Sequence, residues 1–180
     1  CLLIFTISFC SLTYAQMVTD GNTSGWATAL SNNAIKAFVH DNNDTNDDSF
    51  TGGSADTKLV STWAWVNGNT NDKGDITNTA AVLINGVIYF CGDRTAINGD
   101  AQIGFWFFKN GTAKMANGTF APEHADGDLL ILSNFTNGGG KVNLRILYWR
   151  FNPGNQSGYL EDVTALYNSN DTFAYVNSTN

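Results

Sequence analysis

The sequence predicts an all-β fold, an antiparallel β-sandwich or jelly roll of the lectin-like type. Apolar or alternating runs of strand length recur at short intervals, and Asn/Gly-rich turns separate them. The acids support the same conclusion, because Glu123 and Glu161 are the only glutamates and all other acids are aspartates. Asp favours turns, whereas Glu favours helix interiors. A chain of 180 residues is long enough for one domain with a sizeable core.

The clearest strands lie in the middle of the chain. Residues 80–84 and 87–91 are apolar runs joined by Asn85-Gly86, a pair that favours the type I′ turn of a β-hairpin. The stretch GFWFFKNGTAKM repeats this pattern and predicts a second hairpin turn at Asn110-Gly111. Residues 159–168, YLEDVTALYN, are the single predicted helix. The other predicted strands, in chain order, are the stretches AIKAFVHD, LVSTWAWV, DLLILS and KVNLRILYWRF.

The N-terminal stretch resembles the end of a secretory signal peptide. Residues 2–12 are an apolar run too short to span a bilayer, and Thr13-Tyr14-Ala15 is a suitable cleavage site before Gln16. We therefore expect a signal peptide over residues 1–15, truncated at its start, and one domain over residues 16–180. We expect that domain to be a fragment of a longer protein, and we expect the fragment to lack the C-terminal strands of the sandwich. The alternative is a buried N-terminal strand.

Charge and cysteine content restrict the partners and the compartment. The net charge is −7, and the Lys and Arg residues are scattered, which argues against nucleic acid or anionic membrane surfaces as partners. Signal cleavage would leave Cys91 as the one thiol, predicted to be a small buried hydrophobe. An exported domain without disulfides is typical of bacterial surface proteins. The expected location is secreted or cell-surface, with no membrane insertion after cleavage.

Aromatic residues give the candidate ligand-binding positions. In a strand, the odd-numbered residues of 103–108 share one face and the even-numbered residues share the other. An outward Trp could stack on the apolar face of a sugar ring, and an Arg could bind a ligand carboxylate or hydroxyl. Core packing of the rings and a structural ion pair for the Arg are the alternatives. The candidates are Trp63, Trp65, Trp106 and Arg94.

Loop acids give the candidate metal ligands, because Asp and Asn oxygens are the ligands that Ca²⁺ prefers. The candidates are Asp72, Asp75, Asp93 and Asp100, which could alternatively bind sugar hydroxyls or form ordinary Asx turns. Residues 41–48, DNNDTNDD, lack the central Gly and terminal Glu of an EF-hand loop. Residues 41–48 could still form an irregular calcium-binding loop.

Catalytic motifs are scarce in the sequence. It holds neither a Gly-x-Ser-x-Gly elbow nor a His-Glu-x-x-His helix, and its two glutamates lack the neighbours of a glycosidase pair. His124, close to Asp126 and Asp128, is the one candidate acid–base or metal cluster. A loop His that bonds to a nearby Asp for structural reasons is the alternative.

Several motifs together resemble a family of secreted bacterial domains from large surface proteins of Bacteroidetes and Actinobacteria. The resemblance covers residues 50–151, and the family motifs are DKxDIxN, YFGxDR and NGDxQxGFWFF. Here they stand as DKGDITN, YFCGDR and NGDAQIGFWFF, so Cys91 replaces a usual Gly, and Asn69 or Thr70 lies near a usual Pro. The resemblance implies a lectin-like module of adhesin-like proteins. The family has no established activity, and its members often continue with a further β-rich segment after the part that this chain covers.

The sequence thus predicts a non-catalytic secreted or cell-surface module for carbohydrate binding or adhesion. Its expected partners are a glycan or other surface ligand and the rest of a larger surface protein, and Ca²⁺ is the candidate cofactor. A purely structural spacer is the alternative. A hydrolase that uses His124 with Asp126 or Asp128 is the less favoured third hypothesis.

Overall fold

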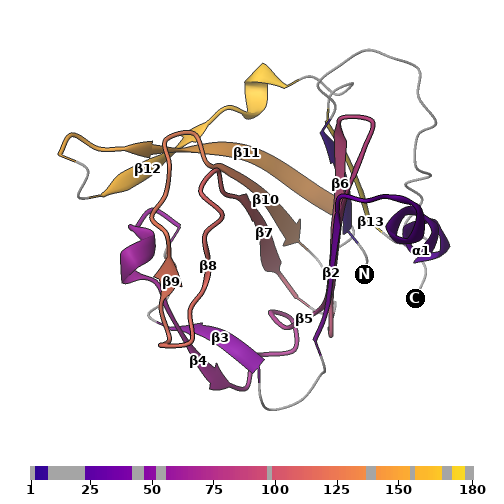
Figure 1. Ribbon diagram of the computed structural model, residues 1–180, viewed down its shortest axis with the longest axis horizontal. Coiled ribbons are helices and arrows are strands. Elements are labelled where there is room, and N and C mark those ends of the chain that lie inside the picture. Colours follow the sequence, from indigo (N-terminus) through magenta and orange to yellow (C-terminus); the bar gives the residue numbers. More distant parts are fainter. Residues whose placement is uncertain are drawn as a thin grey trace.

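The computed structural model describes residues 3–7, 23–41, 47–51, 56–96, 99–136, 141–154, 157–167 and 172–176. It confirms the all-β prediction, because two main antiparallel sheets, of five and four strands, form a sandwich (Figure 1). The five-stranded sheet, in the order β13-β1-β6-β5-β2, contains β1 (Leu3–Ile7), β2 (Lys36–His40), β5 (Ile76–Ile84), β6 (Val87–Arg94) and β13 (Thr172–Val176). The four-stranded sheet, in the order β12-β11-β10-β7, contains β7 (Ala101–Phe107), β10 (Leu129–Thr136), β11 (Lys141–Phe151) and β12 (Gly158–Asp162).

The remaining elements are short. They are helix α1 (Thr23–Asn32), the 3₁₀-helices η1 (Val60–Thr62) and η3 (Thr164–Leu166), and the strands β3 (Asp47–Thr51), β4 (Ala64–Gly68), β8 (Ala113–Lys114) and β9 (Phe120–Ala121). Strands β3 and β4 pair with each other, as do β8 and β9. A bridge between Ala64 and Thr119 joins the two pairs. We call η1, β3, β4, β8 and β9 the outer lobe.

The predicted hairpin at Asn85-Gly86 joins β5 and β6. Both turn residues have positive φ, 52° for Asn85 and 82° for Gly86, as a type I′ turn requires. The register then pairs Ile84 with Val87 and continues along both strands. This local signal therefore sets the pairing at the centre of the five-stranded sheet.

The main core lies between the two sheets. Phe90 of β6 is 1% exposed, and its ring contacts Phe105 and Phe107 of β7 edge-on at centroid distances of 4.9 and 5.0 Å. The odd-numbered residues of β7 therefore face the opposite sheet, as strand alternation requires. The other fully buried members of this cluster are Ile103, Ile131 and Phe135.

Helix α1 covers the other face of the five-stranded sheet. Trp26 and Ala29 of α1 pack with Val82 of β5 and with Tyr89 and Cys91 of β6. Cys91 is a small buried core residue, as predicted, and burial raises the pKa of its thiol to about 12. The thiol is consequently protonated and unreactive at neutral pH.

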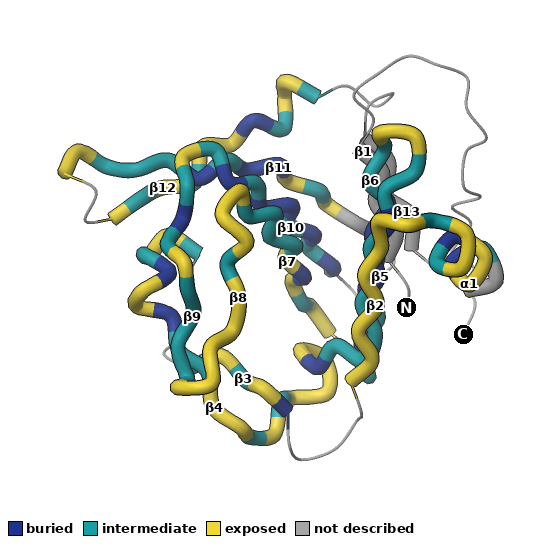
Figure 2. Tube along the Cα trace, viewed as in Figure 1, coloured by how far each residue is buried: buried dark blue, intermediate teal, exposed yellow. Residues whose placement is uncertain are grey.

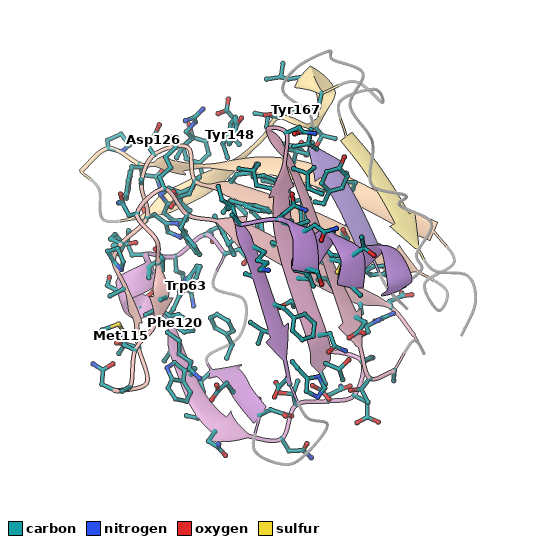
Figure 3. All side chains as sticks on the ribbon, turned by 45° about the vertical axis from the view of Figure 1, so that its right-hand side comes forward. Trp63, Met115, Phe120, Asp126, Tyr148 and Tyr167 are labelled. Atoms are coloured by element: carbon teal, nitrogen blue, oxygen red, sulfur yellow. The ribbon has the colours of Figure 1, made fainter. Side chains whose placement is uncertain are left out.

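The outer lobe covers the outward face of the four-stranded sheet (Figures 1 and 2). Trp149 of β11 points to this side and is 0% exposed. Trp63, which links η1 to β4, lies 5.9 Å from Trp106 of β7 between ring centroids. Trp63 and Phe120 lie together in the lobe (Figure 3), with ring centroids 5.9 Å apart. The sandwich thus has a second aromatic core on its outer face.

Three local predictions were wrong. The described part of the predicted helix, residues 159–167, contains most of β12 and the single turn η3, because β12 pairs with β11 and the Val163 amide donates to the Ile146 carbonyl. Asn110-Gly111 lies between β7 and β8 but forms no hairpin, since β7 pairs with β10 and β8 pairs with β9. The first half of LVSTWAWV is η1, and only its second half is a strand.

The N-terminal strand β1 lies between β6 and β13. An N-terminal strand was the alternative to a signal peptide. Cleavage after Ala15 would remove this strand, so β1 and a cleaved signal peptide cannot both belong to one mature chain. Signal cleavage and export stay predictions. No helix in the described residues has the length and apolar character that a membrane crossing requires.

Candidate functional site

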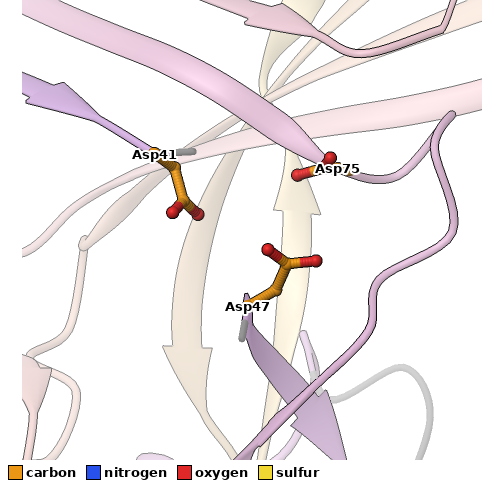
Figure 4. Close-up of side chains that lie close together, drawn as sticks. All are labelled: Asp41, Asp47 and Asp75. Carbon is orange, nitrogen blue, oxygen red and sulfur yellow. The ribbon is translucent and has the colours of Figure 1, made fainter. Parts of the chain in front are cut away.

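Three carboxylates from separate segments meet at one end of the sandwich. Asp41 follows β2, Asp47 begins β3, and Asp75 directly precedes β5. One carboxylate oxygen from each lies within 4.8 Å of the other two, and the groups face a common space (Figure 4). We call Asp41, Asp47 and Asp75 the carboxylate triad. It is the one such group of three potential metal ligands found among the described residues.

Backbone hydrogen bonds fix the segments that carry the triad. The Asp41 amide donates to the Thr77 carbonyl at 2.8 Å, which attaches the end of β2 to β5. The Thr95 amide donates to the Asp75 carbonyl at 3.0 Å, and the Thr95 hydroxyl donates to Oδ2 of Asp75 at 2.6 Å. Asp75 is therefore held beside the end of β6.

Asp47 is the most buried residue of the triad. Its side chain is 3% exposed, and its Oδ2 accepts the Thr70 amide at 2.9 Å. Its Oδ1 is also buried but has no hydrogen-bond partner. No Lys, Arg or His in the described residues forms an ion pair with any member of the triad. Oxygen ligands without nitrogen or sulfur suit a hard divalent cation.

The four predicted metal ligands do not converge on one site, and only Asp75 belongs to the triad. Asp93 accepts hydrogen bonds from the Thr77 hydroxyl and from Nδ2 of Asn78, which places it in a polar network along β5 and β6. Asp72 and Asp100 are exposed and lie outside the triad. The other two members, Asp41 and Asp47, come from the loop DNNDTNDD, whose density of acids was the available sequence signal.

A cavity of about 440 Å³ lies next to the loop that ends in Asp75. Its lining residues are Asn71, Asp72, Lys73 and Gly99, all exposed. Oδ1 of Asn71 accepts the Lys73 amide at 3.1 Å, and the Asp72 carbonyl accepts the Ala96 amide at 3.0 Å. The cavity therefore presents an amide, a carboxylate and an ammonium group on a loop with internal hydrogen bonds. We call it the 71–73 pocket.

Arg94 lies beneath this pocket instead of facing a ligand. It is 5% exposed, and its Nη1 donates to the Lys73 carbonyl at 3.2 Å. Its guanidinium lies 5.1 Å from the ring centroid of Phe135, and burial lowers its pKa. Arg94 is therefore a structural support for the 71–73 pocket and is not placed to bind a ligand in solution.

The tryptophan candidates are mainly core residues. Trp63 is 5% exposed and has no free face for a sugar ring. Trp106 is half-buried, and its ring stacks on Phe108 at a centroid distance of 5.4 Å. Trp65 is half-buried as well; its Nε1 donates to the Met115 carbonyl, and Lys114 lies 4.3 Å from its ring centroid. The structure therefore removes Trp63 as a stacking platform and leaves little open ring area on the other two.

His124 is sealed inside the aromatic core of the outer lobe. Its side chain is 0% exposed, and its ring stacks on Trp149 at a centroid distance of 4.0 Å. Its Nδ1 lies 3.1 Å from Oδ2 of Asp128, a buried acid that also accepts the Lys109 and Ala125 amides. Asp126 instead pairs with Arg150 at the surface. A hydrolase centred on His124 requires a cleft at this ring, and the ring is closed to solvent.

Glu123 joins η1 to the loop before His124. Its carboxylate accepts the amides of Val60, Ser61 and His124 at 2.7, 3.1 and 2.9 Å. Burial raises the pKa of this carboxyl, but the three backbone donors, with the Ser61 side chain, outweigh it and the pKa is lowered overall. Glu123 is therefore an ionised structural link that accepts the first backbone amides of η1.

We expect the stability of the protein to fall as the pH falls below about 6.5, through His124. Burial lowers the pKa of its imidazole from 6.5, although the bond to Asp128 and the charges of Asp128 and Glu123 oppose this shift. Between the lowered native pKa and 6.5, the unfolded chain binds a proton that the native chain does not, so acid favours unfolding. Above pH 6.5 the contribution is constant.

Urea unfolding at pH 7.5, 6.5 and 5.5 tests this pH dependence. The control is His124→Asn, which keeps a donor toward Asp128 but does not titrate. The free energy of unfolding should fall more steeply with acid in the wild type than in the control. Equal slopes in the two proteins would contradict the assignment to His124.

Comparison with known proteins gives no relatives: no protein family, curated protein or solved structure matches this chain. The class of the protein is therefore defined by its own geometry. It is an antiparallel β-sandwich with an aromatic outer lobe, a carboxylate triad and a polar surface pocket.

Proposed function

We propose that the protein is a non-catalytic secreted or cell-surface module that binds a glycan at the 71–73 pocket, in carbohydrate recognition or adhesion. The observation that carries this proposal is the polar lining of that pocket. Carboxylate and amide oxygens accept hydrogen bonds from sugar hydroxyls, and Lys73 and the amide nitrogen donate to sugar oxygens. A volume of about 440 Å³ is in the range of small-ligand sites.

The positions of His124 and of the two glutamates support a binding role. His124 and Asp128 are buried together, and Glu123 is held by three backbone amides. Glu161 forms an ion pair with Arg150 at 2.7 Å. None of these groups faces the 71–73 pocket, whose own carboxylate, Asp72, has no catalytic partner in the lining.

The export part of the proposal is supported by the apolar residues 2–12 and the cleavage site before Gln16. The resemblance to bacterial surface domains gives the same expectation. Intact-mass measurement of the protein from the culture supernatant tests export and cleavage together. A mature chain that begins at Gln16 would support the proposal, and a chain that keeps residues 1–15 would favour β1 as a permanent strand.

Replacing Asp72 with alanine should weaken glycan binding at least tenfold, because the pocket loses the one carboxylate among its described lining residues. The ligand is first identified on a glycan array with the full chain, and its affinity is then measured by titration. Asp126→Ala is the matched control, since it removes an exposed acid outside the pocket. Its affinity should equal that of the wild type.

Two outcomes would contradict this function. A bound glycan with the same affinity for Asp72→Ala would exclude the 71–73 pocket as its site. A folded chain that binds no glycan on the array would favour a structural spacer.

A further inference from the structure

We infer that the carboxylate triad of Asp41, Asp47 and Asp75 is a calcium site that fastens the outer lobe to the edge of the five-stranded sheet. This inference goes beyond the glycan-binding proposal and does not depend on it. The triad differs from the four predicted metal ligands, because Asp41 directly follows β2 and Asp47 begins β3, and only Asp75 is shared.

The spacing of the triad fits one calcium ion. Ca²⁺ binds oxygen at about 2.3–2.6 Å, so two ligands on opposite sides of the ion are about 5 Å apart. The triad oxygens lie within 4.8 Å of one another, which three ligands of a single Ca²⁺ can satisfy. Mg²⁺ binds at about 2.0–2.1 Å and requires near-octahedral geometry, so opposite ligands must approach to about 4.2 Å. Ca²⁺ is the preferred ion because it accepts irregular oxygen coordination, whereas Mg²⁺ requires near-octahedral geometry.

The buried oxygen of Asp47 is a second, independent observation that indicates a ligand. Asp47 is 3% exposed, and one of its two carboxylate oxygens has no hydrogen-bond partner although it is buried. Burial of an unpartnered anionic oxygen is unfavourable, and proteins satisfy such groups with a partner or a metal. This side chain points toward Asp41 and Asp75 (Figure 4), so a cation between the three would be its partner.

The chemistry of the donors selects the class of ion. All three ligands are carboxylates, and the described residues place no Cys or His within the group. Hard oxygen ligands favour Ca²⁺ over Zn²⁺ or Cu²⁺, which favour nitrogen and sulfur. Asp41 is exposed, whereas Asp47 and Asp75 are buried, so water can complete the coordination sphere from the side of Asp41.

The ion would connect elements that belong to different sheets. Asp41 and Asp75 lie at the ends of β2 and β5, which pair with each other at the edge of the five-stranded sheet. Asp47 begins β3, which pairs only with β4 among the described strands. A bound Ca²⁺ would therefore fasten the β3–β4 hairpin to this edge. Without the ion, three carboxylates repel one another at the same junction.

Calorimetric titration of Ca²⁺ into the full chain, after treatment with a chelator, tests the site. Asp41→Asn removes a charge at an exposed position and should leave the fold intact. We expect it to weaken Ca²⁺ binding at least tenfold. Asp47→Asn, which keeps an acceptor for the Thr70 amide, should do the same. The matched control is Asp126→Asn, an exposed acid outside both the triad and the 71–73 pocket, which should bind Ca²⁺ within twofold of the wild type.

The titration has clear outcomes for the proposal. Absence of Ca²⁺ binding by the folded wild type, or unchanged affinity in Asp41→Asn, would overturn it. Tighter binding of Mg²⁺ than of Ca²⁺ would overturn the choice of ion. If Asp47→Asn unfolds, Asp41→Asn alone decides. The fastening role is tested by hydrogen exchange of residues 47–51 and 64–68, which Ca²⁺ should slow in the wild type and not in Asp41→Asn.

The calcium site and the glycan pocket can be separated by the same two variants. If both proposals hold, Asp41→Asn loses Ca²⁺ affinity, and Asp72→Ala loses glycan affinity while it keeps the Ca²⁺ site. Ca²⁺ binding without any glycan ligand would remove the glycan proposal alone. Glycan binding without Ca²⁺ binding would remove the calcium site alone.

Discussion

Replacing Trp149 with alanine is expected to lower the free energy of unfolding by about 3–5 kcal/mol, the range for loss of a large core ring. Trp149 is 0% exposed and stacks on His124, with their ring centroids 4.0 Å apart. Truncation would leave a cavity between the outer lobe and β11, and the surrounding rings cannot all move to fill it. In a chain of this size the melting temperature should fall by about 6–20 °C.

Gly158 of β12 gives an independent test of the same packing. A Cβ built on Gly158 would lie only 2.1 Å from Cζ2 of Trp149, so Gly158→Ala requires the indole or the strand to move. We expect a loss of about 1–3 kcal/mol. The loss should be smaller in a Trp149→Phe background, because the phenyl ring lacks the atoms that a methyl group at position 158 would meet.

Urea unfolding of the single and double variants measures this coupling. Tyr159→Ala is the control, because it removes an aromatic ring that is 48% exposed on the same strand. It should cost less than Trp149→Ala. Equal losses for Tyr159→Ala and Trp149→Ala would show that Trp149 is not the core ring described. Additive losses for Gly158→Ala and Trp149→Phe would show that Gly158 and Trp149 are not in contact.

Replacing Asp128 with alanine should cost about 3–5 kcal/mol, because a buried charged acceptor disappears and leaves its donors unpaired. Oδ1 of Asp128 accepts the Lys109 amide at 2.8 Å. Its Oδ2 accepts the Ala125 amide at 3.0 Å and lies 3.1 Å from Nδ1 of His124. All three donors lie in the segments that follow β7 and precede β10. The variant should therefore loosen His124, whose ring packs on Trp149.

The neighbouring acid Asp126 is the matched control for this prediction. Asp126 is exposed, and its bond to Arg150 lies at the surface, with side-chain exposures of 60% and 30%. Asp126→Ala should therefore cost less than about 1 kcal/mol. Asp128→Asn should fall between the two variants, because it keeps the volume and one acceptor oxygen. Chemical unfolding at pH 7.5 compares them, and a similar loss for both alanine variants would contradict a structural role for Asp128.

The candidate site could be predicted only in part. Asp75 was identified by its loop, and the acid-rich residues 41–48 were recognised as a possible irregular calcium loop. Their meeting depends on the pairing of β2 with β5 and on the position of β3, which are long-range contacts. Asp93 looked equivalent in sequence, but its neighbours Thr77 and Asn78 across the strands already occupy its carboxylate. Sequence spacing cannot show which acids already have partners.

Strand pattern and turn chemistry by themselves determined the fold class. The pair Asn85-Gly86 fixes a hairpin because both residues adopt positive φ readily, and this holds whatever surrounds them. The apolar run DLLILS and the alternating run KVNLRILYWRF both form strands, because successive side chains of a strand point to opposite faces of a sheet. Cys91 was placed in the core on the same ground, and it is 4% exposed.

Only the tertiary structure decided which local signals prevail. Residues 159–162 became a strand because β11 offers an unpaired edge, and pairing with it satisfies more backbone groups than a short helix does. Helix α1 went unpredicted because it has no charged residue at either end, and its Trp26 and Ala29 are stabilised by packing on β5 and β6. Of the tryptophans that could have held a sugar, Trp63 became buried between the outer lobe and the four-stranded sheet, and Trp65 and Trp106 became half-buried. The burial of the tryptophans and the meeting of the three carboxylates both depend on which segments of the chain pack against each other. Neither can be read from the sequence of a single segment.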